Sequence, residues 1–129
     1  MPNKTIEEIT LKVGVWRPQG GNDTRPVRFQ GRQLAEGTVY TGQLASRDDR
    51  GFDYRIYQTQ TGKIVIRWMR WSRWDKESDY ADYAVLESLP GFNQGVAGTL
   101  DPDWEVVVPG DILQEAAKEL GQELAEWIE

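Results

Sequence analysis

The chain has 129 residues and a formal net charge of −6, with 39% hydrophobic and 28% charged residues, values typical of one soluble domain with a single core. Cysteine and histidine are both absent, which excludes disulfides, Ser-His-Asp and Cys-His nucleophilic sites and the usual zinc ligand sets. We therefore expect one domain, residues 1–129, with no cofactor and no bound metal.

The first predicted strand covers residues 9–16, ITLKVGVW, where apolar and polar side chains alternate as in a half-buried strand. Residues 17–26 contain two prolines, two glycines and Asn-Asp, a composition that predicts an exposed loop. Two shorter strands follow at residues 27–34 and 38–44. A turn at Ala35-Glu36-Gly37 is predicted to separate them.

The clearest hairpin joins a strand that begins at Phe52 to one that begins at Lys63, through Thr61-Gly62. β-Branched and aromatic residues dominate both arms. A register change of one residue would alter the cross-strand pairs. A two-residue turn at Thr61-Gly62 places these residues opposite each other: Asp53 and Arg70, Arg55 and Trp68, Tyr57 and Ile66.

The segments after the hairpin are less regular. Residues 79–89 fit a helix that Ser78 would cap and that Pro90-Gly91 would end, and they fit a strand equally well. Residues 91–103 are predicted as a loop from their glycine and proline content, and residues 104–108, WEVVV, as a short strand.

The last predicted element is a helix that begins at about Asp111. Residues 101–129 carry one lysine and nine acidic residues, so the acidity of the chain lies mainly here, where it can neutralise arginines on a neighbouring element. At 100° per residue the apolar side chains fall within an arc of roughly 160°, which predicts packing on an apolar surface. These side chains are Ile112, Leu113, Ala116, Ala117, Leu120, Leu124, Trp127 and Ile128.

The order of the elements, several strands followed by one helix, indicates an α+β fold and argues against βαβ units. We predict a single domain made mainly of an antiparallel sheet of about five to seven strands. One C-terminal amphipathic helix is expected to pack on this sheet.

Residues 67–74 read RWMRWSRW, an Arg-Trp pair repeated three times at a spacing of three residues. Neighbouring residues of a strand point to opposite faces, so the three tryptophans divide between two faces. The more apolar face is assigned to the core beneath the terminal helix and comprises Phe52, Tyr54, Ile56, Val65, Met69 and Trp71. The other face is the candidate ligand-binding surface and comprises Asp53, Arg55, Tyr57, Trp68, Arg70 and Trp74.

Two interpretations of this candidate surface remain open. Paired Arg and Trp side chains can bind a ligand through stacking and guanidinium hydrogen bonds. Alternatively, the Arg stems cover Trp rings within the sheet and have only a structural role, which we favour. We do not expect nucleic acid as a partner, because a protein with a pI of about 4.7 has no net positive field to attract it. We do not expect a membrane as a partner either, because the motif belongs to a hairpin and not to a free amphipathic helix.

Four acids, Asp75, Glu77, Asp79 and Asp82, form a cluster that could ligate a hard cation through oxygen atoms. The EF-hand pattern requires glycine where Tyr80 stands, so that motif fails. We favour a solvated turn that balances the neighbouring arginines, and we predict no metal site.

A group of hairpin residues occurs together with an acid-rich ending: Tyr54, Tyr57, Gln58, Thr59, Gly62, Lys63 and Glu126-Trp127-Ile128-Glu129. On these residues, the segment 52–129 resembles the uncharacterised bacterial family named EXLDI after its C-terminal signature. The last two positions of that signature differ or are missing here. The resemblance implies a small bacterial protein, and it implies no catalytic residues because the family has no established activity.

We predict a protein of unknown function that acts as a non-catalytic binding or interaction module for a protein or a small polar ligand. The alternative is a carboxylate-dependent enzyme acting on a sugar or other small polar substrate, with Asp53 or the acids after Trp74 as acid and base. A third hypothesis is a homodimer formed through the exposed aromatic face. A cytoplasmic location is expected, because neither an apolar run of roughly 20 residues nor a basic leader with an apolar core is found.

Overall fold

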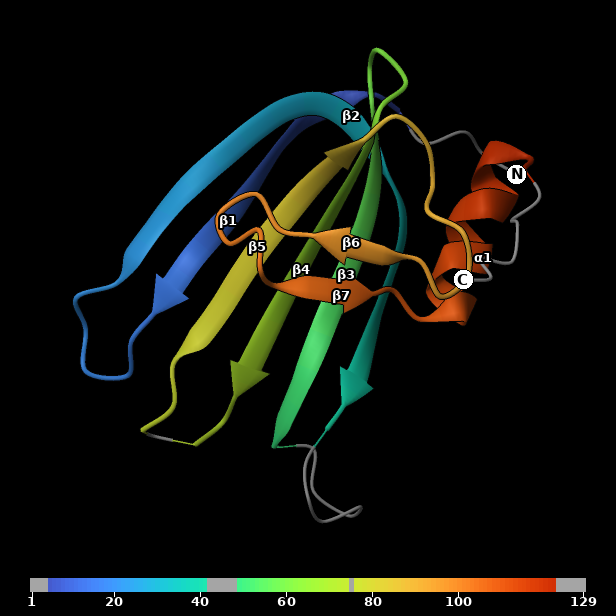
Figure 1. Cartoon of the computed structure of the whole chain (residues 1–129). Coiled ribbons are helices and arrows are strands. Elements are labelled where there is room, and N and C mark those ends of the chain that lie inside the picture. Colours follow the sequence, from blue (N-terminus) through green and yellow to red (C-terminus); the bar gives the residue numbers. More distant parts are fainter. Residues whose placement is uncertain (1–4, 42–48, 75, 123–129) are drawn as a thin grey trace.

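The computed structural model describes residues 5–41, 49–74 and 76–122, which form seven strands and one helix (Figure 1). The predicted α+β fold, an antiparallel sheet with a C-terminal helix packed on it, is confirmed. The elements are β1 (Glu7–Trp16), β2 (Asp23–Tyr40), β3 (Arg50–Thr59), β4 (Ile64–Ser72), β5 (Asp79–Leu86), β6 (Gly95–Ala97), β7 (Glu105–Val107) and α1 (Gly110–Leu120).

The five long strands pair antiparallel in sequence order, and the sheet closes into a barrel because β1 also pairs with β5. This closing seam consists of three residue pairs, from Gly14 and Ala81 to Trp16 and Asp79. The short strands β6 and β7 form a separate hairpin that lies across β3, β4 and β5, with α1 beside it (Figure 1). The segment 79–89, which fitted a helix or a strand equally well, forms strand β5 over Asp79–Leu86.

The turn predicted at Ala35-Glu36-Gly37 is wrong, because β2 runs through these residues as one long strand. Its first half pairs with β1 and its second half with β3, and the register shifts between Gln33 and Ala35. Gly37 is explained by close packing: a Cβ atom there would collide with the side chain of Ile112 on α1. Glycine therefore allows the helix to approach the strand, and no turn is needed.

The predicted pairing of β3 with β4 is wrong by one residue. Asp53 lies opposite Met69, Arg55 opposite Arg67 and Tyr57 opposite Val65. The loop between Thr59 and Lys63 contains three residues where a two-residue turn was expected, and the last of them, Gly62, has a φ of 92°. A three-residue loop with a left-handed glycine is a common hairpin connection, and the extra residue exchanges the faces that meet across the hairpin.

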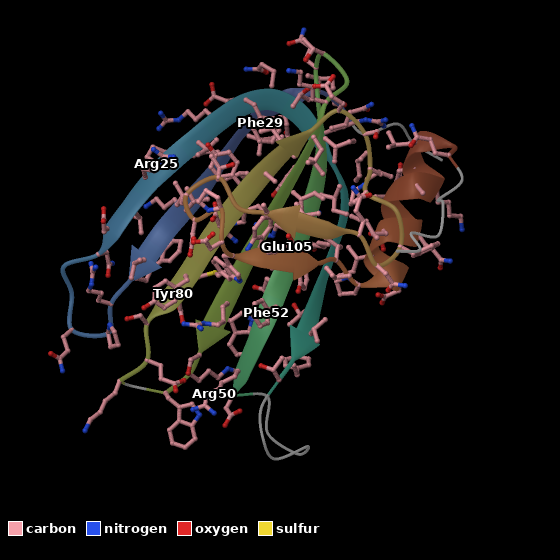
Figure 2. All side chains as sticks on the ribbon, viewed as in Figure 1. Arg25, Phe29, Arg50, Phe52, Tyr80 and Glu105 are labelled. Carbon is pink, nitrogen blue, oxygen red and sulfur yellow. The ribbon has the colours of Figure 1, made fainter. Side chains whose placement is uncertain are left out.

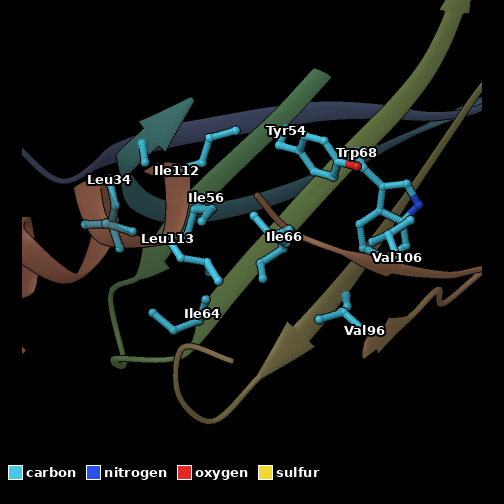
Figure 3. Packing of buried hydrophobic residues seen from close by; sticks show 14 residues of the cluster. Leu34, Tyr54, Ile56, Ile64, Ile66, Trp68, Val96, Val106, Ile112 and Leu113 are labelled. Carbon is cyan, nitrogen blue, oxygen red and sulfur yellow. The ribbon is translucent and has the colours of Figure 1, made fainter. Parts of the chain in front are cut away.

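This register places Trp68 in the core, so the prediction that it lies on a ligand-binding surface is wrong. Trp68 is 0% exposed and shares a face with Tyr54, Ile56 and Ile66. The ring of Trp104 packs edge-on against it with 6.0 Å between centroids. Figure 3 shows this face packed against side chains of the β6–β7 hairpin and of α1; the cluster includes Leu34, Ile64, Val96, Val106, Ile112 and Leu113.

The opposite face of the sheet has a smaller core inside the barrel. Leu11, Tyr57 and Val65 are buried there, with Ile9, Val27 and Phe29 packed around them. Arg67, which is 9% exposed, donates hydrogen bonds from Nε and Nη2 to the carbonyl oxygen of Lys12, at 3.2 and 2.8 Å. Burial lowers the pKa of Arg67 from its usual value. One arginine of the repeated Arg-Trp motif therefore has a structural role.

The predicted C-terminal helix is confirmed as α1, which ends at a left-handed Gly121. Ile112, Leu113, Ala116 and Ala117 are buried, as the periodicity predicted, and Leu120 packs partly against the core. The remaining residues of the predicted apolar arc, Leu124, Trp127 and Ile128, lie outside the described residues.

A buried carboxylate, Asp82 on β5, holds the connection between β6 and β7 in place. Its Oδ1 accepts hydrogen bonds from the backbone N–H groups of Tyr83, Thr99 and Leu100, and its Oδ2 accepts one from Asp101, at 2.7 to 3.1 Å. Asp82 is 1% exposed. The four N–H donors stabilise the carboxylate charge, whose burial without partners would be costly. The same hydrogen bonds fix the connection between β6 and β7.

Candidate functional site

A concave feature lies at the edge where β3 begins, β4 ends and β5 begins. This pocket, which we call the basic pocket, has a volume of about 400 Å³. Figure 2 labels two of its lining residues, Arg50 and Tyr80, in the lower part of the sheet. The lining residues are Thr41, Arg50, Arg70, Trp71, Ser72, Lys76, Glu77, Ser78 and Tyr80.

Glu77, the one carboxylate among the described residues that line the basic pocket, is already engaged. Arg50 donates two hydrogen bonds to it, from Nε to Oε1 at 2.9 Å and from Nη2 to Oε2 at 2.7 Å. The hydroxyl of Ser72 donates a further one to Oε1. These hydrogen bonds lower the pKa of Glu77 to about 2, and Arg50 makes the largest contribution. The side chain is therefore ionised at neutral pH.

The other two cations of the basic pocket have no such partner. Within residues 5–41, 49–74 and 76–122, the ion pairs are Arg50 with Glu77 and Lys63 with Glu87, which leaves Arg70 and Lys76 without a carboxylate within 4.0 Å. The guanidinium carbon of Arg70 lies 4.7 Å from the ring centroid of Tyr80, its cross-strand neighbour. Three cations and one neutralised carboxylate therefore give the pocket an excess of positive charge.

Two of these cations, Arg50 and Arg70, and the neighbouring Arg73 each lie over an aromatic ring. Arg73 lies over Trp71 at 5.5 Å from the ring centroid, and Arg50 lies over Trp74 at 5.6 Å. Trp71 donates its indole N–H to Asp53 Oδ1 at 3.0 Å, which fixes the orientation of the ring. Positive charge and aromatic surface thus alternate along this edge of the sheet.

Two further pockets adjoin the basic pocket through shared side chains. A pocket of about 320 Å³ is lined by Arg50, Trp74, Lys76 and Glu77, and we call it the Trp74 pocket. Another, of about 370 Å³, lies beyond Arg70 and Tyr80 and is lined by these two residues and by Asp101, Asp103 and Trp104. The two sides of this edge therefore differ in charge, basic toward Lys76 and acidic toward the β6–β7 connection.

The structure separates the six residues predicted to form one ligand-binding surface. Arg70 lines the basic pocket and Trp74 the adjoining one, whereas Trp68 is buried. Asp53, Arg55 and Tyr57 lie on the face opposite to that of Arg70, because Phe52 is the residue that pairs with Arg70. Sequence reasoning missed Arg50, Lys76, Glu77 and Tyr80. Their only shared signal is a position at the end of a strand or in the loop that joins two strand ends.

The acidic cluster predicted as a solvated turn is also dispersed. Glu77 pairs with Arg50, Asp79 accepts a hydrogen bond from the backbone N–H of Ser72 at 2.8 Å, and Asp82 is buried with its four backbone donors. Asp75 lies outside the described residues. In the part of the chain that the structure describes, no group of three or more acidic side chains is placed to hold a metal ion.

Comparisons with known proteins returned no match: no family model, no curated protein and no solved structure resembles the chain closely enough to identify a relative. The resemblance to the EXLDI family therefore stays a prediction. Among the described elements there is no helix with both the length and the apolar composition needed to cross a membrane.

Proposed function

We propose that the protein is a non-catalytic binding module, and that its basic pocket takes the anionic group of a small polar ligand. The observation that carries this proposal is the pair of cations, Arg70 and Lys76, that line one pocket without a carboxylate partner among the described residues. A cytoplasmic location is part of the same proposal.

The geometry of Arg70 supports an anion site. Stacking on Tyr80 restrains the guanidinium group, so less side-chain freedom is lost when it binds a ligand. A planar guanidinium can donate two parallel hydrogen bonds to a carboxylate or a phosphate. The pocket volume of about 400 Å³ also lies within the range of roughly 300–1,000 Å³ that is typical of small-molecule sites.

The alternative, a carboxylate-dependent enzyme, has less support in the basic pocket. Such an enzyme needs a carboxyl group that holds a proton near neutral pH, and hence a raised pKa. The pKa of Glu77 is instead lowered to about 2. One observation favours this alternative: the pocket beyond Tyr80 is lined by two carboxylates, those of Asp101 and Asp103.

A titration followed by NMR tests the anion site. Phosphate and acetate are added at constant ionic strength while the indole N–H signals of Trp71 and Trp74 are recorded. We expect saturable shifts of these signals in the natural protein and about tenfold weaker binding in Arg70→Gln, because one charge-assisted interaction is worth roughly 1.5–3 kcal/mol.

The matched control is Arg28→Gln, which removes another exposed arginine, from β2, that lines none of these pockets. Binding in this variant should equal that of the natural protein. The proposal is wrong if neither anion gives saturable shifts, or if both variants weaken binding equally.

A further inference from the structure

Trp74 combines exposure with a fixed orientation. Its side chain is 48% exposed, yet its indole N–H donates to Asp49 Oδ2 at 3.0 Å. The guanidinium carbon of Arg50 lies 5.6 Å from the ring centroid, and the backbone N–H of Trp74 donates to Ser72 Oγ at 3.0 Å. An exposed ring that is held in this way loses little freedom when a second ring stacks on it.

The Trp74 pocket and the basic pocket are joined by a common wall. Arg50, Lys76 and Glu77 line both, so the Arg50–Glu77 ion pair borders each of the two pockets. Lys76 can therefore meet negative charge in either pocket. A ligand long enough to cross the ion pair would contact the ring of Trp74 at one end and Arg70 at the other.

We propose that the ligand of this site is a small molecule in which a flat ring is joined to an oxyanion, with the ring stacked on Trp74 and the oxyanion beside Arg70 and Lys76. The inference rests on the proposed function, to which it adds the ring. Stacking of a planar group on a tryptophan is attractive whatever the ring's edge groups, whereas an anion without a ring gains nothing from this stacking. Arg50 can take part in both the ring contact and the oxyanion contact, because it lies over Trp74 and lines each pocket.

Two pairs of probes, each differing by a ring, test the inference by calorimetry and by the NMR shifts described above. One pair is adenosine 5′-monophosphate and ribose 5-phosphate, and the other is phenylacetate and acetate. We expect the ring to improve affinity about tenfold in at least one pair, the gain typical of one base stacked on an aromatic side chain. The pair that shows the gain identifies the oxyanion as phosphate or carboxylate.

The variant Trp74→Ala should abolish this gain, so that the two members of each pair bind with equal affinity, whereas Trp74→Phe should retain most of it. The matched control is Tyr40→Ala, which removes an aromatic side chain that is 55% exposed at the end of β2 and lines none of the three pockets. Its gain should equal that of the natural protein.

The inference is overturned if neither ring-bearing probe binds more tightly than its partner, or if Tyr40→Ala removes the gain as fully as Trp74→Ala does. In both cases the proposed anion site survives as long as ribose 5-phosphate or acetate binds. If no probe binds at all, the anion site and the ring site are both wrong.

Discussion

Replacing Asp82 by asparagine tests whether one buried carboxylate holds the β6–β7 connection on the sheet. Asparagine keeps an oxygen for the three N–H groups that Oδ1 accepts, but it turns an NH₂ group toward the N–H of Asp101, where Oδ2 accepts now. One charge-assisted hydrogen bond is lost, three lose the charge, and two donors face each other. Since a hydrogen bond to a charged group contributes roughly 1.5–3 kcal/mol, we expect a loss of about 3 kcal/mol in the free energy of unfolding.

Thermal and urea unfolding measure this loss, which corresponds to a decrease in Tm of about 12 °C for a chain of this size. Amide hydrogen exchange should also accelerate at Thr99, Leu100 and Asp101, the donors that Asp82 holds in the loop. Asp103→Asn is the matched control, because Asp103 is an exposed aspartate in the same connection. The reasoning is refuted if Asp82→Asn costs no more than this control, within about 0.5 kcal/mol.

Three further predictions concern stability. Trp68→Ala should cost about 4 kcal/mol in urea unfolding because it empties a fully buried site, whereas Trp74→Ala should cost less than about 1 kcal/mol; equal losses would contradict the assigned burial. The folded pKa of Glu77 is about 2, below the unfolded value of about 4.3, so the stability that its ion pair contributes is present above that value and is lost as the pH falls through about 2. The stability difference between the natural protein and Glu77→Gln should therefore be constant above about pH 5 and shrink between pH 4 and 2; a constant difference down to pH 2 would disprove the ion pair. Gly14→Ala should cost about 3 kcal/mol, since Gly14 has a φ of 120° and a Cβ there would meet the carbonyl oxygen of Asp23; a loss below about 1 kcal/mol would show that β1 can relax.

The helix and most of the strands could be predicted because each depends on local sequence. The 3.6-residue period of α1 and the β-branched residues of β3 and β4 specify these elements without reference to the rest of the chain. The continuity of β2 could not be predicted, because Gly37 lies against the side chain of Ile112, on a helix more than seventy residues later in the chain. From sequence alone, a glycine that makes room for a neighbour looks the same as one that makes a turn.

The candidate site was only partly predictable, for a reason of the same kind. The loop before Lys63 has a third residue, so Trp68 lies on the same face as Tyr54 and Ile56. It is therefore buried in the core and not on the expected surface. Of the six predicted residues, Arg70 and Trp74 remain in the candidate site. They lie at the end of β4 and just beyond it, where the pockets are. Arg50 and Glu77 come from segments that only the pairing of β3, β4 and β5 brings together.

The narrow seam between β1 and β5 has a consequence for how the protein folds. Strands β2 to β5 pair with their neighbours in sequence, whereas the seam joins two ends of the sheet that are far apart along the chain, through three residue pairs. Closing so long a loop has a large entropic cost, and only the few contacts of the seam offset that cost. We expect the seam to form last during folding and to open first under stress, so that the molecule alternates between a closed barrel and an open curved sheet before it unfolds as a whole.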